Sequence, residues 1–360
     1  MLNETLSAKV KKCKLLLTFD HELPLGSLHT SFETALFEPT NKVLSTAEDM
    51  NVPVTLFTDV LCAIKFQEWN RQDFFEPYQN QLHEALKRGH DVQLHIHPHW
   101  LTTHYNGQNY LPSRDFTLAG FASHPLHNID SIIKSGVTFL NDSCKKVDKT
   151  YQCIAYRGGG YNLFPHKDDI INSLLKCGIL FDSSVCKGYY FKSSLSEVDY
   201  RKTPSQPNWY LETEIYAGNT DNPGIMEIPI AGIPKKLFEI PTKFKMKKYA
   251  GRAPDNFGSQ IHENPYSGLK NKLRLMLSSR MLSFDNYTYS SDYLIKILEH
   301  NINKYHAYDE IMLCAIGHPK SMSNYSFQLF REFIEKVREK FHDKVEFYTY
   351  RKLYDEMKNK

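Results

Sequence analysis

The sequence lacks the features that mark a membrane-spanning, secreted or nucleic-acid-binding chain. No stretch approaches the roughly 18 consecutive apolar residues that cross a bilayer, and the opening segment MLNETLSAKVKK has no apolar core of the secretory type. Basic residues barely exceed acidic ones, with 44 Lys and Arg against 41 Asp and Glu. The net charge therefore gives no reason to expect nucleic acid as a partner, and we expect a cytoplasmic protein.

Cysteine is scarce and irregularly placed. The 360 residues include 7 cysteines, with no C-x-x-C pair and no zinc-finger spacing. Several lie in apolar runs, which is typical of reduced, buried side chains. Internal repeats and low-complexity tracts are also absent, and 41% hydrophobic with 24% charged residues is ordinary for a globular protein.

Short apolar runs alternate with segments of helical spacing along most of the chain. Strands are expected at 14–19, 52–57, 92–97, 153–156, 179–181, 226–230, 311–316 and 345–350. Helices are expected at 31–50, 74–88, 129–147, 168–177, 291–303, 327–340 and 353–358. This alternation implies parallel strands with helical crossovers. About seven such units favour a closed or nearly closed α/β barrel, formed by residues 1–360 as a single domain.

The stretch 187–289 interrupts the alternation, because it is rich in Tyr, Lys, Pro and Asn and has one clear strand. We expect an insertion over one rim of the barrel, or a small subdomain. Within it, the segment 235–280 is basic, and its end at 268–280 resembles a basic amphipathic helix. Such a segment is either a solvated surface or a contact with diphosphate or with the cytoplasmic leaflet of a membrane. Its basic residues are Lys235, Lys236, Lys243, Lys245, Lys247, Lys248 and Arg252, followed by those of 268–280.

Polar residues cluster where the expected strands end. Because the carboxyl ends of barrel strands meet on one face, these residues are expected to share one pocket. The strand ends in question are Thr18-Phe19-Asp20-His21-Glu22, His95-Ile96-His97-Pro98-His99, Arg157-Gly158-Gly159-Gly160-Tyr161, Asp182-Ser183-Ser184 and Gly317-His318-Pro319.

These residue types are the equipment for hydrolysing an amide or ester. Two or three imidazoles and a carboxylate can hold a divalent metal that activates water. A further carboxylate can take a proton from that water, and a histidine can give one to a leaving amine. The arginine can hold the carboxylate in its ionised form, and the glycines let backbone N–H groups approach an oxyanion.

In this order, the five motifs resemble those of the polysaccharide deacetylase superfamily, which comprises carbohydrate esterase family four and its relatives. The family's T-F-D-D motif corresponds to 18–22, its H-S-x-x-H motif to 95–99 and its R-x-P-x-G motif to 157–161. Its fourth motif centres on an Asp after a strand, and its fifth is an apolar strand that ends in His. The resemblance implies a distorted (β/α)7 barrel with a large insertion on one rim. It also implies metal-dependent removal of an N- or O-acyl group from a sugar.

The resemblance further assigns a role to each matching residue, with Zn²⁺ as the expected ion. Asp20 would be the general base, Arg157 its tether, His318 the general acid with Asp182 tuning it, His95 and His99 metal ligands, and Gly160 a backbone donor to the oxyanion.

Four positions depart from the family pattern, and one of them is Gly159, which stands where the family has Pro. His21 replaces the second Asp of the first motif, and we prefer Glu22 as the third ligand because it points the same way as Asp20; His21 is the alternative. His97 could replace or supplement His99 as a ligand. Tyr161 stands where the family has Gly, which affects the fit of substrate.

The favoured function is removal of an acetyl or formyl group from a sugar in surface polysaccharide or lipopolysaccharide O-antigen biosynthesis. The substrate would be linked to a nucleotide or a polyprenyl carrier, and the protein could lie at the inner face of the membrane. The alternatives are a hydrolase of a non-sugar amide on the same fold, without a metal, and a non-catalytic glycan-binding protein.

Overall fold

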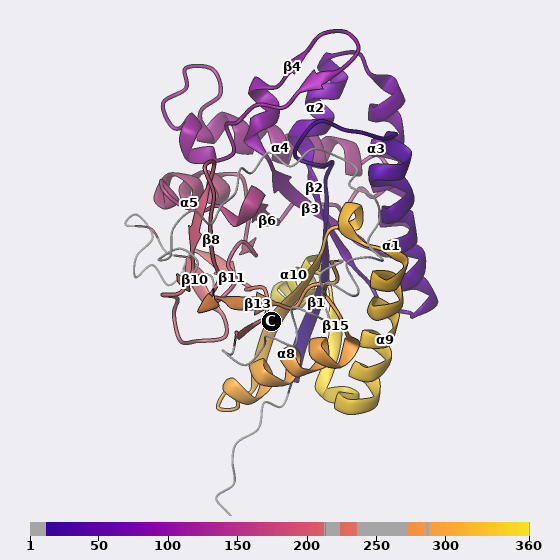
Figure 1. Ribbon diagram of the computed structural model, residues 1–360, viewed down its shortest axis with the longest axis vertical. Helices are drawn as coiled ribbons and strands as arrows, with labels where there is room; N and C mark the ends of the chain where they lie inside the picture. Colours follow the sequence, from indigo (N-terminus) through magenta and orange to yellow (C-terminus); the bar gives the residue numbers. More distant parts are fainter. Residues whose placement is uncertain are drawn as a thin grey trace, which may run out of the picture.

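The computed structural model describes residues 12–211, 213, 224–235, 273–274, 276–285 and 288–359. The main element of this part of the chain is a curled, largely parallel sheet (Figure 1). Its strands are β1 (Lys12–His21), β2 (Thr55–Asp59), β3 (Asp91–Ile96), β6 (Ala155–Gly158), β7 (Phe181–Asp182), β10 (Trp209–Leu211), β11 (Ile225–Glu227), β14 (Glu310–Gly317) and β15 (Val345–Tyr348).

The strands β11-β7-β6-β3-β2-β1-β14 run parallel to their neighbours, and their order round the sheet follows the chain. Ile230, just after β11, forms a parallel bridge with Cys314 of β14 and so joins the two ends of this series. β15 pairs with the first half of β1, and β10 adds an antiparallel strand beyond β11. The predicted α/β barrel is therefore confirmed, with a closure that rests on single bridges.

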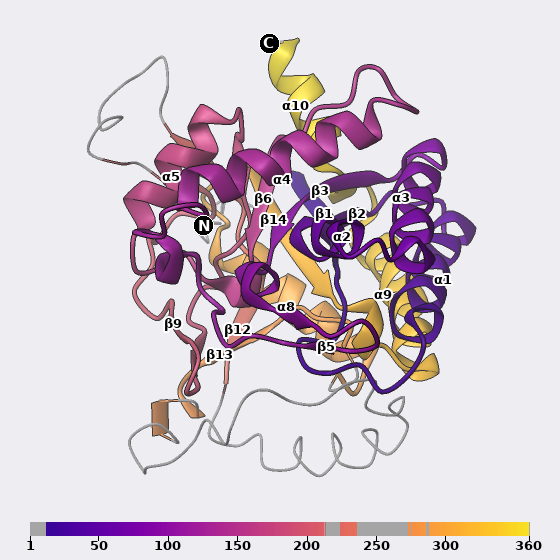
Figure 2. The ribbon, with the colours of Figure 1, turned by 90° about the horizontal axis from the view of Figure 1, so that it is seen from above.

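Helices cover the outside of the sheet, and Figure 2 shows α3, α4 and α5 around the central strands. The helices are α1 (Glu38–Asp49), α2 (Val60–Glu68), α3 (Gln72–Lys87), α4 (Ile129–Cys144), α5 (Lys167–Lys176), α8 (Ser291–Lys304), α9 (Asn324–Phe341) and α10 (Tyr350–Lys358). Helix α2 was not predicted, because its apolar start follows β2 directly and the two read as one run. A π-helical turn, η1 (Glu33–Phe37), precedes α1.

The core is divided into two clusters by the alternation of side chains along β1. Leu15, Leu17 and Phe19 belong to the large cluster between the sheet and the helices. Leu16 belongs to a second cluster, inside the barrel, which also contains Tyr350 of α10. Because side chains on a strand alternate in direction, the residues after Leu16 on its face continue along the inside of the barrel.

Short two-stranded ribbons complete the described fold. β4 (His104–Tyr105) pairs with β5 (Tyr110–Leu111), β8 (Tyr190–Lys192) with β9 (Glu197–Asp199), and β12 (Gly232–Pro234) with β13 (Ser279–Met281). The proposal that 187–289 is an insertion or subdomain stays a prediction. Among the basic residues predicted there, Lys236, Lys243, Lys245, Lys247, Lys248 and Arg252 lie outside the described residues. No helix within the described part of the chain has the length and apolar character needed to cross a membrane.

Candidate active site

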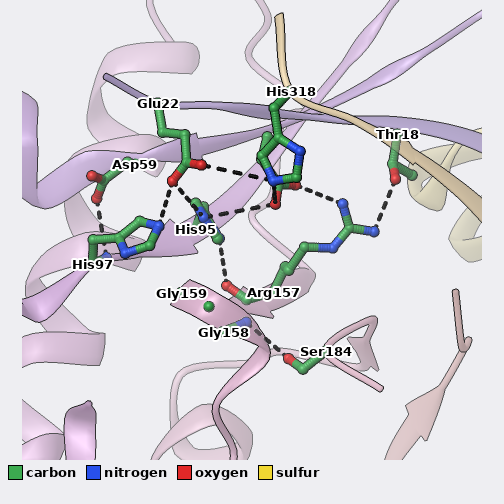
Figure 3. A network of polar contacts seen from close by, with 12 residues as sticks. Thr18, Glu22, Asp59, His95, His97, Arg157, Gly158, Gly159, Ser184 and His318 are labelled. Carbon is green, nitrogen blue, oxygen red and sulfur yellow. Dashed lines mark hydrogen bonds and ion pairs between the residues drawn. The ribbon is translucent and has the colours of Figure 1, made fainter. Parts of the chain in front are cut away.

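The carboxyl ends of the barrel strands carry polar side chains that point toward one another inside the barrel (Figure 3). On β1 the inward row runs from Leu16 through Thr18 to Asp20, and beyond the strand to Glu22. Four of the five strand ends that were predicted to converge therefore meet in one place, and the fifth, at Asp182, lies apart from them. The other inward residues are His95 and His97 at the end of β3, Arg157 on β6 and His318 after β14.

Glu22, His95 and His97 form a compact group of metal-binding side chains, named here the ligand group. One ligand atom of each lies within 4.8 Å of the other two, and all three residues are buried. The Glu22 Oε2 atom lies 3.3 Å from the His95 Nε2 atom and also contacts the His97 Nε2 atom. One carboxylate and two imidazoles suit Zn²⁺ and related divalent ions, with positions left for water or substrate. The side chains present therefore fit a divalent metal.

A hydrogen bond orients the His95 imidazole, and two neighbours position the backbone of His97 and leave room for its ring. The His95 Nδ1 atom lies 2.8 Å from the carbonyl oxygen of Arg157, so Nδ1 donates to that oxygen and Nε2 faces the ligand group. The backbone N–H of His97 donates to Asp59 at 3.2 Å. A Cβ at Gly159 would come within 2.7 Å of the His97 Nδ1 atom, so glycine allows this close approach. Outer contacts of this kind hold metal ligands in position.

Asp20 lies beside the ligand group and is tethered by a buried arginine. The Arg157 Nη1 atom donates to Asp20 at 2.6 Å, and the Nη2 atom donates to Thr18 at 2.8 Å. Burial alone raises the pKa of the Asp20 carboxyl, but Arg157, followed by His95, outweighs burial and holds that pKa below its usual value. Asp20 is therefore an ionised carboxylate that can accept a proton in the pocket.

His318 contacts Asp20 and is oriented by a second carboxylate, Asp285. The His318 Nε2 atom lies 3.4 Å from Asp20 Oδ2, and its Nδ1 atom lies 3.0 Å from Asp285 Oδ2. The backbone N–H of His318 also donates to Asp285 Oδ1 at 2.7 Å. Burial alone lowers the pKa of His318, but Asp285 and Asp20 outweigh burial and raise that pKa well above its usual value. His318 thus carries a proton that it can pass to a leaving group.

Lys320 adds a cation next to the ligand group. Its Nζ atom lies 2.9 Å from Glu22 Oε1 and donates to the carbonyl oxygen of Leu23 at 3.0 Å. Burial alone raises the pKa of Glu22, but Lys320, followed by His97, holds it well below the usual value. Glu22 is therefore ionised, with one oxygen on Lys320 and the other facing the imidazoles.

Asp182, the residue expected to tune His318, lies in a different network. It accepts hydrogen bonds from the backbone N–H and the hydroxyl of Ser184, each at 2.8 Å. The Ser184 hydroxyl in turn accepts from the backbone N–H of Gly158 at 2.8 Å. Because β7 lies between β6 and β11 in the sheet, Asp182 supports the glycine turn after β6. The carboxylate beside His318 is Asp285, which corrects the expectation for Asp182.

His21, the alternative ligand, lies on the outward face of β1. Its Nδ1 atom lies 2.8 Å from the Thr58 hydroxyl, and its Nε2 atom lies 2.9 Å from Gln81 Oε1. Burial, partly opposed by Gln81, lowers the pKa of His21 to about 4. Both nitrogens are thus engaged on the side of the strand opposite to Asp20.

His99, an expected ligand, follows Pro98 in the short helix η2 (Pro98–Thr102). Its ring stacks on Phe116 with 4.8 Å between the ring centroids. The strand geometry of β3 ends before this helix, so the alternation that directs His95 and His97 inward does not extend to His99. Among the described residues, the group that meets around Glu22 contains His97 and not His99.

The polar side chains that meet at the strand ends surround a cavity of about 180 Å³, which is named here the inner pocket. Gly160 and Tyr161, both expected to contact substrate, also line it. Both have positive φ, 59° for Gly160 and 64° for Tyr161, and Tyr161 holds this uncommon conformation at the edge of the pocket. The walls of the inner pocket include Asp20, Glu22, His95, His97, Gly160, Tyr161 and His318.

Three residues that contact the site were not predicted from the sequence: Asp59, Asp285 and Lys320. Asp59 is the last residue of β2, and Asp20 likewise follows the apolar part of β1. The same strand-end pattern could therefore have identified Asp59. Asp285 follows the short apolar run 281–284, inside the stretch that was read as an insertion. Lys320 has no signal beyond its place two residues after His318.

No protein-family model and no curated protein sequence matches the chain. Among solved structures, a protein assigned as a polysaccharide deacetylase from Mycobacterium smegmatis is 12% identical over 97% of this chain and 91% of its own, with a TM-score of 0.47. One with the same assignment from Pseudomonas aeruginosa PAO1 is 10% identical over 97% and 91%, with a TM-score of 0.45. PuuE allantoinase is 11% identical over 94% and 87%, with a TM-score of 0.44. The first two carry the name of the family that the sequence motifs resemble.

Proposed function

We propose that this protein is a metal-dependent hydrolase that removes an N-acyl group, acetyl or formyl, from a sugar. The observation that carries the proposal is the ligand group of Glu22, His95 and His97 beside Asp20 and His318 in the inner pocket. A metal site, a proton acceptor and a proton donor in one pocket are the groups that metal-assisted amide hydrolysis uses. A glycan-binding protein without catalysis would need none of these three.

The steps of hydrolysis divide among the side chains of the site. A divalent ion held by the ligand group would supply Lewis-acid chemistry that acidifies water and polarises the acyl carbonyl. We propose that this ion is Zn²⁺. Asp20, held ionised by Arg157, takes a proton from the attacking water. His318, oriented by Asp285, gives its proton to the nitrogen that leaves. Water is thereby added across the C–N bond, and the products are the free acid and the amino sugar.

Gly160 and Tyr161 complete the proposal on the substrate side. We assign the backbone N–H of Gly160 to the developing oxyanion and Tyr161 to contact with the sugar. Their positions on the wall of the inner pocket support both assignments. Asp182 contributes indirectly, since its contact with Ser184 supports the turn that begins at Gly158.

We place the reaction in surface polysaccharide or lipopolysaccharide O-antigen biosynthesis, in the cytoplasm or at the inner face of the membrane. The substrate would be an acylated sugar linked to a nucleotide or polyprenyl carrier. The basic segment 235–280 is the proposed membrane contact. In its described part, Leu273, Met276 and Leu277 are 54%, 48% and 57% exposed, which supports contact with an apolar surface.

The proposal is tested by metal analysis together with an assay for acetate and formate released from a panel of N-acylated amino sugars. We expect a stoichiometric divalent ion, activity that is lost on chelation, and recovery of activity when zinc is added. Asp20→Asn, which leaves the three ligands in place, should retain the ion and lose turnover. A purified protein that binds no metal and releases no acid from any of the sugars would refute the proposal.

Lys320 favours a second candidate, a hydrolase that acts on a non-sugar amide without a metal. Its ammonium group, 2.9 Å from Glu22, places a positive charge at the site where a carbonyl could be polarised. This candidate predicts that activity survives both chelation and His95→Ala. The metal-dependent hydrolase would lose activity in both experiments.

A further inference from the structure

A second cavity of about 590 Å³, named here the outer cavity, adjoins the inner pocket. The two share five wall residues, which are Glu22, Leu25, Tyr161, Tyr189 and His318. The inner pocket, at about 180 Å³, is close in size to the roughly 150 Å³ cavity that holds one benzene molecule, so it cannot hold an acylated sugar together with a group linked to that sugar. A substrate whose acyl group reaches Asp20 would therefore extend past His318 into the outer cavity.

The outer cavity has a cationic wall. Lys235, Arg280 and Lys320 line it, against two carboxylates, Glu22 and Asp285. Both carboxylates have a close partner at the site: the Lys320 ammonium group lies 2.9 Å from Glu22, and the imidazole Nδ1 atom of His318 lies 3.0 Å from Asp285. Lys235 and Arg280 place two further positive charges on the same wall, which suits an anionic ligand.

Lys235 and Arg280 are held on one ribbon. β12 and β13 pair antiparallel, with Arg280 opposite Ile233. Lys235 follows β12, and its Nζ atom donates to the Ser278 hydroxyl at 3.0 Å. The ribbon is fixed to the barrel because the backbone N–H of Leu282 donates to the carbonyl oxygen of Ala231 at 2.7 Å, and Ala231 in turn bonds to β14. The two cations thus reach the cavity from a supported element.

Aromatic rings line the same cavity. Tyr161 and Tyr189 contact each other edge to face, with 6.0 Å between centroids, where the inner pocket meets the outer cavity. The ring centroids of Tyr289 and Tyr293 are 5.1 Å apart, and these two residues line the outer cavity but not the inner pocket. Aromatic faces bind the apolar faces of rings, and Arg and Lys bind phosphate through charge-assisted hydrogen bonds.

We propose that the outer cavity binds a phosphate group of the substrate through Arg280 and Lys235, while the acylated sugar reaches inward past Tyr161 and Tyr189. The inference rests on the proposed function, because that function places the acyl group in the inner pocket. It assigns side chains to the phosphate ester or diphosphate that a nucleotide- or polyprenyl-linked sugar carries, and it excludes neutral polysaccharide chains as the preferred substrate.

The test measures binding by calorimetry in the Asp20→Asn background, which leaves the probe intact. The probes are N-acetylglucosamine, its 1-phosphate, and the same sugar linked to uridine diphosphate. We expect the phosphorylated probes to bind at least about tenfold more tightly than the neutral sugar, since hydrogen bonds to charged groups have this magnitude. The double variant Arg280→Gln, Lys235→Gln should remove this preference and leave binding of the neutral sugar unchanged.

The matched control is Lys296→Gln, which removes a positive charge that is exposed on α8, outside the cavity. It should retain the preference for phosphate. Equal binding of neutral and phosphorylated probes, or a preference that survives in the double variant, would overturn the inference.

This outcome is separate from failure of the proposed function. If no acid is released by the wild-type protein but the phosphate preference depends on Arg280 and Lys235, the anion site stands and the hydrolase assignment fails. If the wild type and the double variant both release acid equally well from neutral and from phosphorylated sugars, the hydrolase stands and the phosphate site is refuted.

Discussion

The carboxyl and amino ends of the barrel both contain buried charges, but the partners of those charges differ. At the carboxyl end, Asp20 and Glu22 are 2% and 5% exposed and line the inner pocket. Each has a cation on one carboxylate oxygen, Arg157 or Lys320, and histidines near the other oxygen. One oxygen of each carboxylate is therefore held by a cation, and the other faces the pocket.

At the amino end, Lys14 and Asp91 are buried to a similar degree, at 5% and 1% exposed. At this end, helix α10 supplies a partner to each of the two residues. The Lys14 Nζ atom contacts Glu356 of α10 at 2.8 Å, and Asp91 accepts a hydrogen bond from the backbone N–H of Arg351 at 3.2 Å. Neither residue lines the inner pocket or the outer cavity.

The comparison shows that burial of charge does not by itself identify a functional site. The distinguishing features of the carboxyl end are a cavity and carboxylate oxygens that face titratable groups. We expect substitutions there to reduce activity more than stability. Substitutions at the amino end should have the opposite balance, as is expected when active-site groups are arranged for chemistry rather than stability.

Asp20→Asn is expected to have the largest effect. The amide keeps an oxygen that can accept from Arg157, so the fold should be retained, but it cannot take a proton from water. We expect kcat/KM to fall by about 10²–10⁴-fold, the usual contribution of a general base. The same chemical change at the other end, Asp91→Asn, is the matched control and should leave kcat/KM unchanged. Near-normal turnover in Asp20→Asn would remove the assigned role.

The choice between His97 and His99 is tested by metal retention. His97→Ala removes a member of the ligand group, so we expect metal affinity to fall by more than the roughly 10–100-fold that outer partners contribute. His99→Phe keeps the ring that stacks on Phe116 and removes both nitrogens, so it should retain the ion. Metal content after dialysis, with the visible spectrum of the cobalt form, measures both. The reverse result would restore His99 as the ligand.

The barrel could be predicted from the alternation of strands and helices along the chain, and part of the site from the alternation of side chains along a strand, whereas the roles of the site residues are implied by the resemblance to a family. A strand directs every second residue inward, so Asp20 and Glu22 were expected to share a pocket, and His21 to differ from them. The same rule stops where the strand stops. His99 lies beyond Pro98 in a helical turn, and strand alternation no longer describes its direction.

Asp285 could not be placed from the sequence for a different reason. Its segment forms one isolated bridge with β14, between Ser283 and Ile316, which leaves no strand-length pattern to detect. Its contact with His318 joins residues 33 positions apart. Contacts of this kind depend on how the chain closes the barrel, which local pattern does not determine.

Asp91→Asn should change the pH dependence of stability. Burial raises the pKa of Asp91 to about 6, although hydrogen bonds from Gln93 and Arg351 oppose the rise. Between about pH 4 and about pH 6 the folded protein therefore holds a proton that the unfolded chain has released, so the free energy of unfolding falls as pH rises. Above this window, wild-type stability is reduced by up to about 3 kcal/mol, a reduction that the variant lacks.

Urea unfolding from about pH 4 to about pH 8 measures this linkage. The unfolding free energy of Asp91→Asn relative to the wild type should increase across the window and then stay level. Asp292→Asn, at a side chain that is 82% exposed, is the control for loss of a surface carboxylate. A difference that does not vary with pH would show that Asp91 is already ionised in the folded protein at low pH.

Lys14→Met should give the smallest effect. The lysine side chain is 6% exposed, but Glu310 and Glu356 are 40% and 35% exposed and regain water when it is removed. We expect the free energy of unfolding to fall by about 1 kcal/mol or less, because the two carboxylates that remain are partly exposed and ion pairs in contact with solvent contribute little. Lys12→Met is the matched control in urea unfolding. Lys12 lies on β1 with Lys14, its side chain is 36% exposed, and it pairs with Glu346. Reduced acyl release by Lys14→Met at unchanged stability would mean that the amino end acts on the pocket, and the contrast between the two ends would no longer hold.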